Sequence, residues 1–158
     1  MANWDERWIN TAALQASFSK DRSTKVGAVI VSNDQVVVSM GWNGFPRGCD
    51  DNDDSLHERP TKYLWTVHAE LNAVLNAARK GRAIENCTLY CTHSPCAACS
   101  LLIAQAGIRQ VVVPAIQNED FRARWLSDLA ISQEIFARMK VIYRSVDVPI
   151  IIPGPAAG

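Results

Sequence analysis

No run of apolar residues in these 158 positions is long enough to cross a membrane, so we expect no membrane association. Net charge is also lacking: 16 basic residues balance 16 acidic ones, which gives no broad basic surface for a long nucleic acid, although a local patch stays open. Five cysteines do not suggest a disulfide framework, and no signal peptide or repeat is seen. We therefore expect a cytoplasmic protein, or one of the host cytoplasm if its source is viral. The composition, 48% hydrophobic and 20% charged, suits a single globular domain.

Two short motifs carry the residues that could bind a metal. The first is His68-Ala69-Glu70 and the second is Pro95-Cys96-Ala97-Ala98-Cys99. One imidazole and two thiolates are three ligands for a tetrahedral Zn²⁺ and leave a fourth position for water. Cys96 and Cys99 are three residues apart, so on a helical turn their sulfurs face the same way. Glu70 is placed to move protons rather than to bind metal.

An open zinc site of this kind is catalytic. Zinc lowers the pKa of its bound water to roughly 7 and so gives a hydroxide nucleophile at neutral pH, and Glu70 would act as the proton shuttle. The alternative is a closed structural site, which needs a fourth protein ligand. None is found at a matching spacing among the remaining histidines and cysteines, which are His57, His93, Cys49, Cys87 and Cys91. We expect one catalytic zinc ion per chain.

Both motifs should lie at helix N-termini. Ser94 is a good N-cap and Pro95 suits the first helical position, so a helix should span residues 96–106. Residues 69–79 are strong helix formers and are followed by Gly81, which favours a helix end. A helix N-terminus and a metal both favour thiolate over thiol. Two helix N-termini would then converge on the metal.

The rest of the chain alternates between helix and strand. Apolar spacing predicts helices over residues 4–18 and 121–139, and apolar runs predict strands over 26–31, 36–40, 88–92, 110–113 and 140–143. The first two strands should form a hairpin, and the later ones, which alternate with helices, should be parallel. The expected fold is a three-layer α/β/α structure with a mixed five-stranded sheet. Residues 1–148 would form one domain and residues 149–158 a Pro/Gly-rich tail.

The paired motifs match the H-x-E and P-C-x-x-C signature of zinc-dependent nucleobase deaminases. The chain resembles the cytidine and deoxycytidylate deaminase superfamily from about Ser23 to Met139, and most of all its deoxycytidylate (dCMP) branch. The zinc motifs alone identify the superfamily. The dCMP branch is favoured by Asn72 and by the segment Gly41-Trp42-Asn43-Gly44-Phe45-Pro46-Arg47-Gly48.

The resemblance implies a reaction and several substrate contacts. The expected reaction converts dCMP, or a 5-substituted dCMP, to the corresponding dUMP and ammonia. By resemblance, Asn43 binds the deoxyribose, the backbone N–H of Ala69 meets the pyrimidine carbonyl, and the carbonyl of Ser94 accepts from the departing amino group. The resemblance also implies a homo-oligomer, either a dimer or a hexamer.

A nucleotide substrate also needs partners for its 5′-phosphate. Arg22, Ser23 and Lys25 precede the first strand, and Arg47 follows the Asn43 turn. Arginine offers a bidentate fork and lysine a point charge, and we take Ser23 and Lys25 as the first candidates. The alternative is that these are solvated loop residues, as most surface charges are.

Several aromatic positions depart from the family pattern. Trp42 stands where tyrosine is usual, a change that could be harmless or could reshape the pocket wall. No tyrosine follows the fourth strand to stack on the base. Phe121 or Trp125 could replace it, although core packing is the favoured interpretation for an aromatic residue. His93 could line the pocket, orient a metal ligand, or be an ordinary partly buried histidine.

The acidic run Asp50-Asp51-Asn52-Asp53-Asp54 lies where dCMP deaminases often bind a regulatory triphosphate, dCTP or dTTP, with Mg²⁺. Clustered carboxylates could hold Mg²⁺ through water. A solvated charge run is the favoured interpretation, because like charges usually lie in exposed loops.

Two other functions stay open. A tRNA adenosine or free-purine deaminase would use the same metal motif, but such relatives commonly carry methionine between the cysteines and a glycine shortly after. This chain has Ala97-Ala98 and Ser100 instead. A catalytically silent, deaminase-like binding subunit would have no chemical need for Glu70. Zinc-dependent turnover would separate these classes.

Overall fold

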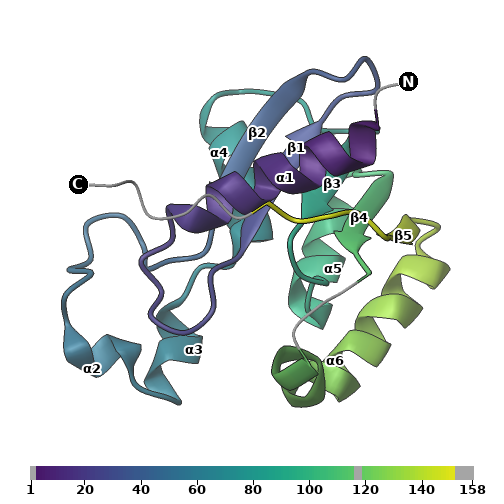
Figure 1. The fold of residues 1–158 in the computed structure, drawn as a ribbon. Coiled ribbons are helices and arrows are strands. Elements are labelled where there is room, and N and C mark those ends of the chain that lie inside the picture. Colours follow the sequence, from purple (N-terminus) through teal and green to yellow (C-terminus); the bar gives the residue numbers. More distant parts are fainter. Residues whose placement is uncertain (1–2, 116–118, 152–158) are drawn as a thin grey trace.

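The computed structural model describes residues 3–115 and 119–151 (Figure 1). The elements run in the order α1 (Trp4–Ser17), β1 (Gly27–Val31), β2 (Val37–Trp42), α2 (Asp54–His57), α3 (Thr61–Trp65), α4 (Ala69–Arg79), β3 (Thr88–Cys91), α5 (Ala97–Gln105), β4 (Gln110–Pro114), α6 (Glu119–Arg138) and β5 (Ile142–Val146). Among the helices of this described part, none has the length and apolar character that a bilayer span requires. Most of the predicted tail, residues 152–158, lies outside the described residues.

The strands form one mixed sheet in the order β2-β1-β3-β4-β5. β1 pairs antiparallel with β2 and with β3, whereas β3, β4 and β5 run parallel. The predicted hairpin and the mixed five-stranded sheet are both confirmed. Because β1 is antiparallel to its neighbours, its first residue, Gly27, lies beside Trp42 at the end of β2 and beside Thr92 just after β3. The segment before β1 and the loops after β2 and β3 therefore meet at the same end of these strands.

Helices cover both faces of the sheet, as the three-layer prediction required (Figure 1). α1 packs on one face, α4 and α5 cover the other, and α6 packs against α5 and β5. Alternate residues of β1 serve the two layers: Ala28 and Ile30 join the α4 side, and Val29 and Val31 join the α1 side. β1 is buried along its whole length, which explains why its sequence is a continuous apolar run.

The close packing of α4 against β2 fixes the first zinc motif relative to the sheet. A Cβ atom on Gly41 would come within 2.5 Å of the Ala73 nitrogen and 2.6 Å of the Ala69 oxygen, so only glycine permits this approach. Asn72 Nδ2 also donates to the carbonyl of Trp42 at 2.7 Å. The first turn of α4 is therefore held against the loop that follows β2.

Some elements differ from the sequence predictions. The short helices α2 and α3 were not predicted, because a turn or two of helix shows no apolar periodicity. Asp53 caps α2 by accepting from Ser55 N, so part of the acidic run begins a helix. β5 begins at Ile142 rather than at residue 140, because Lys140 has a φ of 57° in the turn after α6.

The helix of the second motif begins later than predicted. Cys96 is the N-cap of α5, with extended backbone, and its Sγ accepts from Cys99 N at 3.5 Å. The Ser94 hydroxyl is hydrogen-bonded to Tyr143 Oη at 2.7 Å instead. The prediction of a Ser94 cap with Pro95 at the first helical position was therefore wrong.

Candidate active site

The predicted metal ligands meet in the folded chain. The ligand atoms of His68, Cys96 and Cys99 lie within 4.8 Å of one another, and the part of the chain that the structure describes holds no other such group. His68 Nδ1 is 3.5 Å from each sulfur. Zinc–nitrogen and zinc–sulfur bonds of about 2.1 and 2.3 Å at a tetrahedral angle place the two ligand atoms about 3.6 Å apart. The donor set therefore fits a zinc ion.

Two helix N-termini converge on this group, as predicted. His68 is the N-cap of α4 and Cys96 is the N-cap of α5. Hydrogen bonding from Cys99, and then from His68, lowers the pKa of the Cys96 thiol to about 4. The same bond to Cys96, with burial, raises the pKa of Cys99. Hydrogen bonding to Cys96 raises the pKa of His68 to about 9. These surroundings therefore favour the thiolate form of Cys96.

Glu70 lies in the first turn of α4, beside the metal-ligand group. It is 4% exposed, and it lines the pocket that also contains His68 and Cys96. Burial raises the pKa of its carboxyl above the ordinary value, and the nearby His68 opposes that effect. A carboxyl with a raised pKa accepts a proton more readily than an ordinary one and can return it, which suits the predicted shuttle.

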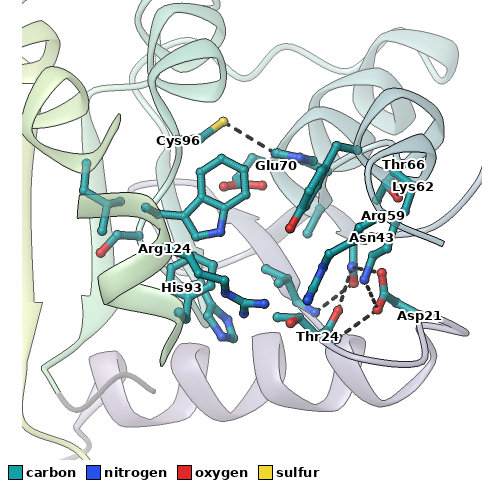
Figure 2. Close-up of a pocket in the computed structure, with 18 residues that line it drawn as sticks. Asp21, Thr24, Asn43, Arg59, Lys62, Thr66, Glu70, His93, Cys96 and Arg124 are labelled. Carbon is teal, nitrogen blue, oxygen red and sulfur yellow. Dashed lines mark hydrogen bonds and ion pairs between the residues drawn. The ribbon is translucent and has the colours of Figure 1, made fainter. Parts of the chain in front are cut away.

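The pocket brings together most of the residues that the sequence singled out (Figure 2). Besides the metal-ligand end, its lining includes Asn43, Ala69, His93, Ser94 and Trp125. Glu70 and Cys96 lie towards one end of this pocket, whereas His93, Arg124 and Thr24 gather towards the other (Figure 2).

The predicted phosphate ligands are not in this pocket. Arg22 is paired with Asp54 at 2.7 Å and Arg47 donates to Asn76, and neither lines it. Ser23 and Lys25 line a neighbouring cavity. Trp42 lies outside as well: its ring packs edge-on against Phe18 at 5.5 Å between centroids. Of the two alternatives for Trp42, its position outside the lining favours a change that leaves the pocket wall as it is.

Two arginines that the sequence analysis missed line the pocket instead. Arg59 lies just before α3, with its guanidinium 5.8 Å from the ring centre of Tyr63, and Arg124 lies in α6. Within residues 3–115 and 119–151, neither has a carboxylate partner. No local sequence motif marks these two arginines, because they come together only where α3 and α6 face the same pocket.

Aromatic rings form a further part of the lining. Trp125 makes edge contacts with His68 and with Tyr63, at centroid distances of 6.5 and 6.1 Å. Phe121 packs edge-on against His93 at 4.6 Å. Core packing was the favoured interpretation for Phe121 and Trp125, and it was wrong: both are partly exposed and line the pocket. The same face of α6 reaches α5 only further along the helix, where Asp128 accepts from Ala97 N and Ser132 is hydrogen-bonded to Ser100.

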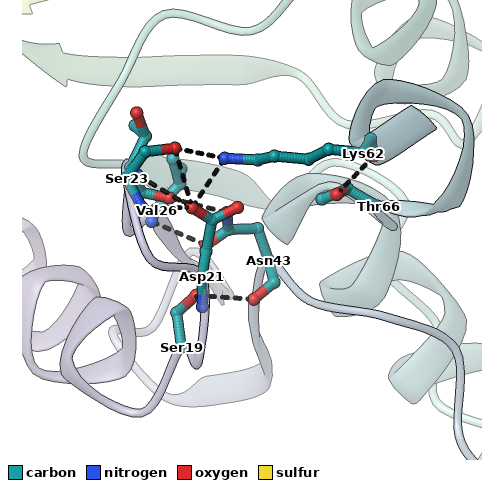
Figure 3. A network of polar contacts seen from close by, with 8 residues as sticks. Ser19, Asp21, Ser23, Val26, Asn43, Lys62 and Thr66 are labelled. Carbon is teal, nitrogen blue, oxygen red and sulfur yellow. Dashed lines mark hydrogen bonds and ion pairs between the residues drawn. The ribbon is translucent and has the colours of Figure 1, made fainter. Parts of the chain in front are cut away.

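Asn43 belongs to a polar network that joins three segments (Figure 3). Its Oδ1 accepts from Val26 N at 2.8 Å, and its Nδ2 donates to the Thr24 carbonyl at 2.8 Å. Its own carbonyl accepts from the Ser19 hydroxyl at 2.7 Å. Asn43 therefore ties the loop after β2 to the segment before β1, while its side chain still lines the pocket.

A buried ion pair completes this network (Figure 3). Lys62 of α3 is 8% exposed; its Nζ is 2.7 Å from Asp21 Oδ1 and also bonds the Ser23 hydroxyl. Asp21 Oδ1 accepts from the backbone nitrogens of Ser23 and Thr24 as well. Burial alone would raise the pKa of Asp21, but these donors lower it overall. The pair fixes the wall that carries Thr24.

Lys62→Met is expected to lower the free energy of unfolding by about 3–5 kcal/mol, because it leaves the Asp21 carboxylate buried without its partner. Denaturant unfolding at pH 7 measures this. The folded pKa of Asp21 lies below its ordinary 3.8, so the contribution of the pair is present above that pH and is lost as pH falls below it. Lys20→Met, which removes an exposed pair with Asp51, is the control and should cost about 0–1 kcal/mol. Equal losses would contradict the prediction.

Fold and site together define a class. The chain has a mixed sheet, and a His-x-Glu and a Pro-Cys-x-x-Cys motif lie at two converging helix N-termini. These motifs are the signature of the zinc-dependent nucleobase deaminases. A sequence model of the cytidine and deoxycytidylate deaminase zinc-binding region matches residues 2–115. The chain therefore belongs to the cytidine and deoxycytidylate deaminase family, as its sequence resemblance predicted.

Individual relatives agree with this assignment. The chain is 43% identical over 141 residues to an uncharacterised deaminase of Aliivibrio fischeri, covering 89% of this chain and 92% of that one. It is 38% identical over 122 residues to the deoxycytidylate deaminase of Homo sapiens, covering 74% and 67%. It also matches the crystal structure of a dCMP deaminase from cyanophage S-TIM5 in complex with dCMP and dUMP. That match has a TM-score of 0.73 and 29% identity, and covers 92% of this chain and 99% of that one.

Proposed function

We propose that this protein hydrolyses dCMP, or a 5-substituted dCMP, to the corresponding dUMP and ammonia. The observation that carries the proposal is one pocket with a deaminase centre towards one end and two arginines in its lining that lack carboxylate partners among the described residues. The base of a nucleotide substrate needs the deaminase centre, and its phosphate needs the arginines. The relatives named deoxycytidylate deaminase support this choice of substrate.

At the base end, His68, Cys96 and Cys99 would hold the zinc ion. When bound, zinc supplies a water of lowered pKa, and hence a nucleophile at neutral pH. Glu70 would accept a proton from the attacking water and pass it to the ring nitrogen. It would then carry a second proton, from the hydroxyl added at the ring carbon, to the amino group, which leaves as ammonia. The backbone N–H of Ala69 would donate to the pyrimidine carbonyl, and the Ser94 carbonyl would accept from the amino group that leaves. The bond from Tyr143 to Ser94 holds this loop in position.

At the other end, Arg59 and Arg124 would bind the 5′-phosphate. They come from segments far apart in the sequence, and both line the pocket. Charge-assisted hydrogen bonds from guanidinium groups to phosphate oxygens are strong and favour bidentate geometry. This assignment replaces Arg22, Ser23, Lys25 and Arg47 as the first candidates.

The wall between the two ends would hold the sugar. Asn43 lines the pocket and is the proposed deoxyribose ligand, and Trp125, beside His68, is the ring best situated to contact the base. Both side chains are held in place, Asn43 by hydrogen bonds to two segments and Trp125 by its ring contacts. A preorganised wall lowers the entropy cost of binding.

Regulation and assembly are separate expectations. In the acidic run, Asp51 pairs with Lys20, Asp54 pairs with Arg22, and Asp53 caps α2. These contacts favour a structural loop over a Mg²⁺ site for regulatory dCTP or dTTP. A homo-oligomer, dimer or hexamer, is expected from the resemblance.

Ammonia release by the zinc-loaded protein tests the proposal. The substrates are dCMP, deoxycytidine, dCTP, CMP and adenosine-containing RNA, each with and without dCTP/Mg²⁺ or dTTP/Mg²⁺. We expect turnover of dCMP well above that of deoxycytidine. Turnover of RNA, or of none of these substrates, would overturn the proposed function.

A further inference from the structure

His93 stands at the end of the pocket where the phosphate would lie. It belongs to the loop between β3 and α5, and with Thr24, Phe121 and Arg124 it lines both the pocket and the neighbouring cavity. Figure 2 shows its ring near Arg124 and away from Glu70. Its Nδ1 is 3.0 Å from the Thr92 hydroxyl, and its ring packs against Phe121.

The Thr92 hydroxyl determines which nitrogen of His93 carries the hydrogen. Thr92 Oγ1 accepts from the backbone N–H of Gly27 at 3.2 Å, so this contact does not use the single hydrogen of the hydroxyl. If that hydrogen is donated to His93 Nδ1, every group of the chain Gly27–Thr92–His93 is satisfied. Nδ1 is then an acceptor, and the neutral ring carries its hydrogen on Nε2.

The opposite tautomer would be less well satisfied. With the hydrogen on Nδ1, Thr92 Oγ1 would accept two hydrogen bonds, and its own hydrogen would find no acceptor among the described residues. Thr92 is 8% exposed, so water is a poor substitute there. A buried donor without a partner is unfavourable. The hydrogen-bond order therefore favours Nε2–H.

The Nε2 atom reaches the pocket space. In the described part of the chain, every fully buried side-chain nitrogen or oxygen has a hydrogen-bond partner. His93 Nε2 has no partner among the described residues, so it is not one of these fully buried atoms. Nε2 is therefore not enclosed by protein, and the spaces that the His93 side chain lines are the pocket and the neighbouring cavity, both of which Arg124 also lines. Burial of the ring lowers the pKa of His93 to about 4, so the imidazole is neutral at pH 7. A neutral ring in this tautomer offers one donor and no lone pair at Nε2.

We infer that His93 donates from Nε2 to an oxygen of the 5′-phosphate beside Arg124, and that Thr92 is the positioning residue that sets this tautomer. The inference rests on the proposed function, because it assumes a phosphate at this end of the pocket. An acceptor at Nε2 would repel a phosphate oxygen, whereas a donor adds a directed hydrogen bond to the charge of the arginines.

The tautomer is measured directly by long-range ¹H–¹⁵N correlation on protein with ¹⁵N-labelled histidine at pH 7, with His93 assigned from the His93→Gln spectrum. We expect a protonated Nε2 and an unprotonated Nδ1. Thr92→Val should populate the other tautomer, and Thr92→Ser, which keeps the hydroxyl, should not. A protonated Nδ1 in the unmodified protein would overturn the inference.

Binding of the product separates a phosphate contact from a structural effect. Calorimetry with zinc-loaded protein compares dUMP with deoxyuridine. We expect His93→Leu to weaken dUMP binding by about 10- to 100-fold and to leave deoxyuridine unchanged. His93→Gln, whose amide can donate from nearly the position of Nε2, should restore most of the affinity. An equal loss for both ligands, or no loss for dUMP, would contradict the inference.

The two failures can be told apart. If the unmodified protein does not turn over dCMP, the proposed function fails. If it does, but His93→Leu weakens the binding of dUMP no more than that of deoxyuridine, the function stands and the role of His93 is rejected.

Discussion

Glu70→Gln is expected to reduce ammonia release from dCMP by about 10³- to 10⁴-fold while the zinc content stays at one ion per chain. The amide has the shape of the carboxyl but cannot accept the proton of the attacking water or return it to the leaving group. Zinc should stay bound because its proposed ligands are His68, Cys96 and Cys99, which the substitution leaves in place. Steady-state kinetics and metal analysis of the same preparation measure both quantities.

The same variant should fold at least as stably as the unmodified protein. Burial raises the pKa of Glu70, which means that the surroundings disfavour its charged form, and a neutral amide avoids that cost. Glu119→Gln, at the exposed start of α6 and outside the pocket, is the control and should change neither activity nor zinc content. A Glu70→Gln enzyme with a near-normal rate would refute the proton-shuttle mechanism.

Removing both pocket arginines is expected to have the second large effect. The double variant Arg59→Ala/Arg124→Ala should lower kcat/KM for dCMP by about 10²- to 10⁴-fold, since a hydrogen bond to a charged group contributes about 1.5–3 kcal/mol. The rate with deoxycytidine, which has no phosphate, should change little. The measured quantity is the ratio of the two kcat/KM values.

Matched arginines outside the pocket serve as controls. Arg122 lies in the same helix as Arg124, and Arg22 is paired with Asp54; Ala variants of each should keep the discrimination between dCMP and deoxycytidine. If the double variant lost activity equally on both substrates, the arginines would be structural. If Arg22→Ala removed the discrimination instead, the phosphate would be bound beside Arg22, outside this pocket.

The chemistry-bearing residues could be predicted from sequence because they are local. Cys96 and Cys99 are three positions apart at the start of α5, a spacing that brings their sulfurs together. Glu70 follows the N-cap His68 in the first turn of α4, so these two residues lie at one helix N-terminus. The sheet was predictable for a similar reason: continuous apolar runs such as that of β1 mark buried strands.

The proposed phosphate ligands could not be predicted in this way. Arg59 and Arg124 are 65 positions apart, and they meet in one lining because a short helix and a long one face the same space. The local sequence of Ser23 and Lys25 was attractive, yet both face the neighbouring cavity. The N-cap of α5 was misassigned because Tyr143, from a strand almost 50 residues later, engages the Ser94 hydroxyl. Such competition is tertiary and leaves no trace in the local pattern.

The residues that line the pocket come partly from helices packed on the sheet and partly from segments further out, and this has a consequence for how such enzymes diversify. The metal ligands and Glu70 are anchored to helices that pack on the sheet, whereas Arg59 precedes a short helix at its margin and Arg124 lies in the first half of α6 (Figure 1). If the two arginines bind the 5′-phosphate as proposed, exchange of these outlying segments would alter which group is admitted at the 5′ position while the metal centre is inherited intact. Selection for a nucleoside, a nucleotide or a longer phosphate chain would then act on two separable parts of one gene.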